Sequence, residues 1–142
     1  MPTFTKFYSF VEAVHEKVHN LGSDTLRVIL TSDAPSLSWT QLSSVTGQLS
    51  TANGYTQNNK QVSQTSSGQS SGLYTLIVSD PSWTASGGNL GSGSFRYAIV
   101  YNDTASNDEL IGYIDYGYLI TVASGQTFTI DFDQVSGLYY AS

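Results

Sequence analysis

The chain has 142 residues, a length that fits one domain, and a formal net charge of −6 at pH 7. Only 11% of its residues are charged, and its five Lys and Arg residues are scattered, whereas nucleic-acid binding requires clustered cations that displace counterions from phosphates. It has no Cys, which excludes disulfides and thiolate metal sites, and no apolar run reaches the roughly 18 residues of a membrane-spanning helix. We therefore expect neither a nucleic acid nor a membrane as a partner.

The first regular element is predicted as one amphipathic helix over residues 6–21. Apolar residues recur there at helical spacing and form one stripe: Phe7, Phe10, Val11, Val14, Val18 and Leu21. Thr3 or Thr5 is placed to cap its start, and Gly22 stands where a left-handed residue commonly ends a helix. The stripe predicts that this helix packs on the rest of the domain.

The next segment begins with a strand over residues 26–31, in which apolar residues alternate, and then becomes less regular. A short helical turn is predicted between residues 39 and 45, and the pair Asn53-Gly54 is a strong turn signal. Residues 63–72, SQTSSGQSSG, are low in complexity. They form either a flexible loop or, if a neighbouring strand pairs with them, a polar hairpin.

From residue 74 onward the alternation of apolar and polar residues is clear. Strands are predicted around residues 74–78, 95–101, 110–116, 119–122, 128–132 and 138–140. Phe95, Tyr97, Ile99 and Tyr101 are predicted to share one face of their strand. The whole pattern predicts a single mainly β domain over residues 1–142, an antiparallel β-sandwich or jelly-roll-like barrel with one N-terminal amphipathic α-helix.

One segment matches a zinc motif, because His15-Glu16-Lys17-Val18-His19 has the form H-E-x-x-H. On a helix the two His would lie one turn apart and could bind zinc, with Glu16 as general base. The extended form of the motif fails, because its third-ligand position is Thr25 and Asp24 is one residue out of register. We therefore interpret the two His as boundary residues of a packed helix and predict no metal site.

Other catalytic or metal-binding patterns find little support. The chain has no G-x-S-x-G motif, and its only two His lie close together, which argues against a Ser-His-Asp triad. Asp103, Asp108 and Glu109 surround one predicted loop and could bind calcium, or they could be a solvated turn in which Asn102 and Asp103 bond their own backbone. We predict no catalytic residue, no cofactor and no enzymatic activity.

Four aromatic residues in predicted loops or near the end of the sequence are candidates for an interface. They are Trp39, Trp83, Tyr139 and Tyr140. If exposed, they would anchor a partner or form a platform for sugars, and if buried, they would fill the core of a small sandwich.

Three stretches of the sequence resemble a family of small virion structural proteins of tailed bacteriophages. The phrases that carry the resemblance are HNLGSDTL (residues 19–26), FRYAIVYNDT (residues 95–104) and IGYIDYG (residues 111–117). The resemblance implies a non-enzymatic structural role, and within it a capsid cement, or decoration, protein with a jelly-roll-like fold.

This resemblance also implies the partners and location that we expect. The protein would be made in the host cytoplasm, form a homo-oligomer, most simply a trimer, and bind the major capsid protein on the outer surface of the virion head. The net negative charge of the chain suits that outer position, since there the protein does not face the negatively charged packaged genome. Two alternatives stay open: a virion adhesin that binds carbohydrate of the host surface through loop aromatics, and a metallohydrolase that uses His15 and His19.

Overall fold

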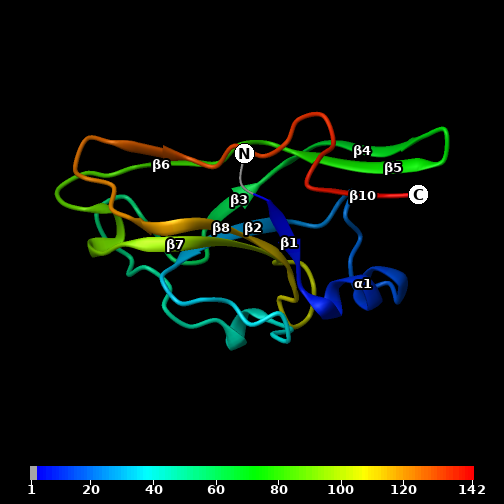
Figure 1. The fold of residues 1–142 in the computed structure, drawn as a ribbon, viewed down its shortest axis with the longest axis horizontal. Coiled ribbons are helices and arrows are strands. Elements are labelled where there is room, and N and C mark those ends of the chain that lie inside the picture. Colours follow the sequence, from blue (N-terminus) through cyan, green and yellow to red (C-terminus); the bar gives the residue numbers. More distant parts are fainter. Residues whose placement is uncertain (1–2) are drawn as a thin grey trace.

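The structure is a computed structural model that describes residues 3–142. The fold is mainly β, with antiparallel sheets and one α-helix, as the sequence predicts (Figure 1). The strands are β1 (Phe4–Lys6), β2 (Leu26–Thr31), β3 (Lys60–Val62), β4 (Gln64–Ser70), β5 (Leu73–Val78), β6 (Ser82–Thr84), β7 (Phe95–Asn102), β8 (Leu110–Ile120), β9 (Thr127–Thr129) and β10 (Tyr139–Ala141). The helix is α1 (Tyr8–His15), and 3₁₀ turns span Leu42–Ser44 and Leu90–Ser92.

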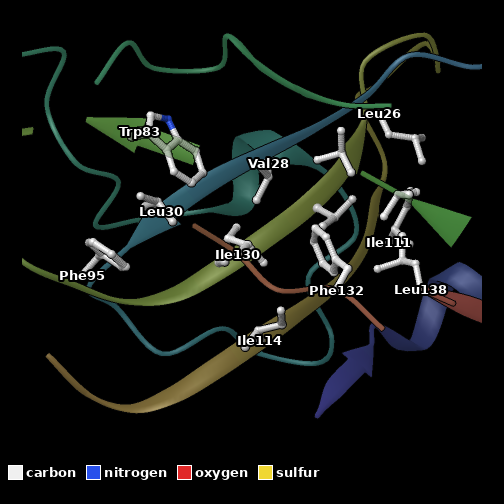
Figure 2. Packing of buried hydrophobic residues seen from close by; sticks show 14 of the residues in the cluster. Leu26, Val28, Leu30, Trp83, Phe95, Ile111, Ile114, Ile130, Phe132 and Leu138 are labelled. Atoms are coloured by element: carbon white, nitrogen blue, oxygen red, sulfur yellow. The ribbon is translucent and has the colours of Figure 1, made fainter. Parts of the chain in front are cut away.

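The sheets stack in a sandwich-like arrangement. A five-stranded sheet has the order β1-β8-β7-β2-β3, and two smaller sheets, β10-β5-β4 and β6-β9, lie over one of its faces (Figure 1). The main core fills the space between these layers, where side chains from β2 and β8 meet Trp83, Ile130 and Phe132 (Figure 2). The finer assignment, a jelly roll, stays a prediction.

The second face of the five-stranded sheet is also covered, mostly by segments without regular secondary structure. Phe7, Ile29, Ile99, Tyr101 and Leu110 form a second buried cluster, against which Trp39, Leu42, Val45 and Tyr113 pack. Because both faces are covered, β2 and β7 are buried along almost their whole length instead of alternating between core and solvent. The predicted helical turn between residues 39 and 45 is confirmed and belongs to this cover.

The predicted N-terminal helix is wrong in its extent. It begins at Tyr8, not residue 6, because Phe4–Lys6 pairs with β8, and Gly112 allows this pairing: a Cβ there would lie 2.5 Å from the Phe4 ring. It ends at His15, because Lys17 takes a left-handed φ of 70° and the chain turns away. Neither Thr3 nor Thr5 caps it, and Gly22 lies beyond its end.

The burial of the predicted stripe is correspondingly uneven. Phe7 and Phe10 are fully buried and Val14 packs against the core, but Val11 and Val18 are exposed. Leu21, beyond the helix, is also buried in the core, so four of the six stripe residues pack inward, but they do not form one continuous helical face.

The predicted turn at Asn53-Gly54 is confirmed by its backbone, and a second turn closes the β4–β5 hairpin. Asn53 and Gly54 both have positive φ, and Ala52 and Tyr55 pair across them. Ser71 and Gly72 also both have positive φ, at 52° and 83°, and they connect β4 to β5. Residues 63–72 thus form the polar hairpin, the second of the two predicted alternatives, with β5 as the neighbour that pairs with them.

One predicted strand face is wrong. Phe95 lies in the main core, whereas Ile99 and Tyr101 lie in the second cluster on the opposite face. The pairing of β7 with β8 shifts between Phe95 and Tyr97, and this bulge reverses the face that the following residues present.

Candidate binding groove

A groove of about 880 Å³ lies between the chain that leaves α1 and the β10-β5-β4 sheet. One wall comes from His15, Lys17 and His19, and the other from Ser67 of β4, Tyr74 of β5 and Tyr139 of β10. Phe10 connects the two walls beneath the surface, because its ring lies 5.3 Å from the His19 ring and 5.1 Å from the Tyr139 ring. Residues that are far apart in the sequence thus build one concave surface.

His19 is the most constrained polar residue of this groove, and only 7% of it is exposed. The Asn102 amide nitrogen, Nδ2, lies 2.9 Å from His19 Nδ1 and donates a second bond of 2.6 Å to Asp24 Oδ2. The Asn102 oxygen accepts from the backbone N–H of Thr104 at 2.9 Å and of Ala105 at 3.2 Å. All four hydrogen bonds together fix the orientation of the buried Asn102 amide.

This orientation determines the tautomer of His19. The Asn102 nitrogen can only donate, so His19 Nδ1 must accept, and the proton of the neutral ring is on Nε2. His19 Nε2 is buried and has no hydrogen-bond partner within residues 3–142. Burial lowers the pKa of His19, although Glu109 and Asp24 oppose this shift, so the ring favours the neutral form. The groove wall therefore contains a buried N–H donor with an unused hydrogen bond.

The two His of the H-E-x-x-H segment do not share a helix. His15 ends α1 and its Nδ1 bonds the Val11 carbonyl at 2.9 Å, whereas His19 lies beyond the left-handed Lys17 and bonds Asn102. In the part of the chain that the structure describes, no three His, Cys, Asp or Glu residues gather where they could hold a metal ion. The helical geometry that a zinc site of this motif requires is thus not formed.

The four predicted interface aromatics lie in three different environments. Trp83 is buried in the main core, and Trp39 is half-buried against the second cluster, so these two fill the interior. Tyr139 lines the groove and Tyr140 is exposed, because successive residues of β10 point to opposite sides. The structure does not bring the four together into one surface.

The acidic loop after β7 is a structured turn. Asn102 bonds the backbone of its own turn, as one of the two alternatives requires, whereas Asp103 instead forms an ion pair with Arg27, with 3.0 Å between Oδ2 and Nε. Burial, with Asp103 and Glu109 nearby, raises the pKa of Asp108. Asn102 is also fully buried, so the N-x-T sequence at residues 102–104 presents no accessible side-chain amide in the folded protein.

Four of the eight exposed large apolar residues that the structure describes form two further groups, near opposite ends of the long strand β8. Tyr8 and Val11 lie on the outer side of α1, which starts beside Ile111, and Tyr118 and Leu119 lie near the other end of the strand. Between Asp115 and Ile120 the β8 chain bulges away from its pairing with β7, and Gly117 has a φ of 84°, so Tyr118 and Leu119 lie on a bulged segment of β8. We call these pairs the helix pair and the strand pair.

Sequence reasoning did not identify these surfaces. Tyr74, Ser67 and Asn102 carried no recognisable motif, and only the fold brings them to His19 or Tyr139. The strand pair had a weak signal, since Tyr118 and Leu119 are adjacent apolar residues that follow Gly117 and interrupt the alternation of β8.

Comparison with known proteins finds no relative: no protein-family model, no curated protein and no solved structure matches the chain. Among the helices that the structure describes, none has the length and apolar character needed to span a membrane.

Proposed function

We propose that this chain is a non-enzymatic structural protein of a phage virion, a decoration protein that binds the outside of the capsid shell and joins neighbouring capsid subunits. The location on the capsid is proposed from the resemblance of three sequence segments to small virion proteins. The joining role is supported by the surface of the molecule.

The observation that carries this proposal is the placement of the helix pair and the strand pair at opposite ends of β8. Tyr8 is 71% exposed, Tyr118 67% and Leu119 61%, although large apolar side chains are usually withdrawn from water. A protein that joins two subunits needs two separate contact surfaces, and β8, which pairs with both β1 and β7 over residues 112–114, lies between them. Figure 1 shows that α1 and the far end of β8 are well separated along the molecule.

Charge and sheet edges support the same proposal. With a net charge of −6, the chain would be repelled by packaged DNA, which favours the outer surface of a head. Strands β4 and β10 lie at the edges of their sheet, and β4 is polar and exposed. Such edges allow self-association, and we propose a closed homotrimer, in which several weak contacts to the shell act together and raise the overall affinity roughly 10²–10⁴-fold.

The proposal is tested on heads that lack this protein. We expect them to assemble but to lose DNA at a lower temperature or after milder osmotic shock than complete heads, and added protein should restore them. Heads that are equally robust without it would refute the proposal, as would a location on the tail tip.

A matched pair of variants connects this test to the structure. The double variant Tyr118→Ser, Leu119→Ser should stay folded but bind stripped heads at least tenfold more weakly, because two apolar contacts are removed. Leu73→Ser is the control, since Leu73 is also an exposed apolar residue but lies in the β4–β5 hairpin, outside both pairs. Equal binding by the two variants would exclude the strand pair as a contact.

A second candidate function, an adhesin that binds carbohydrate, is favoured by one specific observation. The groove combines Tyr74, Tyr139 and the free His19 donor in one concave surface. This function would place the protein on a part of the virion that meets the host.

A further inference from the structure

We propose that the groove between the end of α1 and the β10-β5-β4 sheet binds an acidic saccharide, a sugar ring that carries a carboxylate. This proposal names the ligand class of the second candidate function, and it rests on the groove alone. Its failure would leave the decoration role unaffected, because the helix pair and the strand pair lie outside the groove.

The first step of the argument is the unused donor on His19. A buried N–H without a hydrogen bond destabilises the free protein, so a ligand oxygen that displaces the atoms covering His19 Nε2 and accepts from it removes a penalty already present. The network of Asn102 and Asp24 holds the ring in place, so little side-chain freedom is lost on binding. The ligand must therefore present an acceptor oxygen at this depth of the groove.

The second step is the charge of the lining. The chain has eleven Asp and Glu residues against five Lys and Arg, yet among the described residues that line the groove none is Asp or Glu. Lys17 and both His of the chain are in this lining. Asp24 and Glu109 lie close enough to act on the His19 ring, so we place the anionic group of the ligand at Lys17, the one Lys or Arg residue of the described lining.

The third step is the opposite wall. Tyr74 and Tyr139 are half-buried, their ring centroids are 6.2 Å apart, and the Tyr74 hydroxyl shares a hydrogen bond of 2.9 Å with Ser67 Oγ. Aromatic rings with hydroxyl groups beside them suit a pyranose, which has one apolar face of C–H groups and a rim of hydroxyls. A simple carboxylate would use Lys17 alone and leave this wall unused.

The test is an NMR titration of the whole protein labelled with ¹⁵N at histidine. In the free protein the His19 ring should show a proton on Nε2 and none on Nδ1. Glucuronic acid should shift the His19 ring signals, glucose should do so more weakly, and acetate at the same ionic strength should leave them unchanged. The other His19 tautomer, no shift with glucuronic acid, or an equal shift with acetate would each overturn the proposal.

Two charge variants separate a specific contact from a general effect of charge. Lys17→Gln should weaken glucuronic acid binding about threefold to fivefold, the effect of one partly exposed charge contact, and leave glucose binding unchanged. Lys60→Gln removes the same charge near Trp83, away from the groove, and should change neither. Equal effects of the two substitutions would refute a contact with Lys17.

Discussion

Replacing Asn102 with Ala should destabilise the protein strongly, although Asn102 lies at the end of a strand beside a loop. Its amide makes four hydrogen bonds, one each with His19 and Asp24 and two with the backbone of the turn after β7, and it is fully buried. The bonds to Thr104 and Ala105 contribute little, because water can replace them at the exposed turn. The charge-assisted bond to Asp24 contributes about 1.5 kcal/mol or more.

The loss of the bond to His19 adds a separate cost. In Asn102→Ala, His19 Nδ1 becomes a second unpaired atom on a ring that already has an unpaired Nε2, at roughly 1–3 kcal/mol. Together these effects predict a loss of about 2.5–4.5 kcal/mol in the free energy of unfolding.

Urea unfolding followed by tryptophan fluorescence measures this loss through the shift of the midpoint at constant slope. Asn107→Ala is the control, because Asn107 is the same residue type in the same loop but is exposed. If the two variants differ by less than about 0.5 kcal/mol, a value typical of neutral surface substitutions, the network does not hold the loop and the reasoning is refuted.

Two further predictions concern the same region. Because burial lowers the pKa of His19 below its ordinary 6.5, the unfolded chain binds more protons there, so the free energy of unfolding should fall as the pH drops below about 6.5, by at most about 1.4 kcal/mol per pH unit. His19→Gln should remove this dependence between pH 7 and 5, and an NMR titration that places the His19 pKa at or above 6.5 would contradict the prediction. Val14→Ala should cost roughly 1–3 kcal/mol because Val14 packs on the core, whereas Val11→Ala, an exposed position on the same helix, should cost under about 0.5 kcal/mol. Equal denaturation midpoints for these two variants would show that α1 does not pack on the core.

Local patterns predicted much of the fold because they report local physics. The alternation in residues 95–101 and 110–116 identified β7 and β8, and Asn53-Gly54 identified a turn, since both signals depend on neighbouring residues alone. The helix was predicted too long because its apolar spacing continues to Leu21, while its true start depends on a strand pairing with residues more than 100 positions away. The bulge after Phe95 had no signal in the sequence, because the partner strand creates it.

The groove shows the same limit. His19 and Asn102 are 83 positions apart, and no motif connects them to Tyr74 or Tyr139. The sequence did point to His19 and Tyr139, but for other reasons: a zinc motif for the first and a possible interface for the second. Only the fold shows that His19 lies in a groove wall and that Tyr139 lies opposite.

The pairing of β1 with β8 also bears on how the chain folds. Phe4 lies opposite Ile114, and Phe10 packs on Tyr139, so β1 and α1 find these partners only after more than 100 further residues have been synthesised. Contacts this distant in sequence are characteristic of chains that fold slowly, in milliseconds to seconds. Until β8 is available, the apolar side of α1 has nothing to cover it, so the growing chain is most exposed to aggregation during its own synthesis.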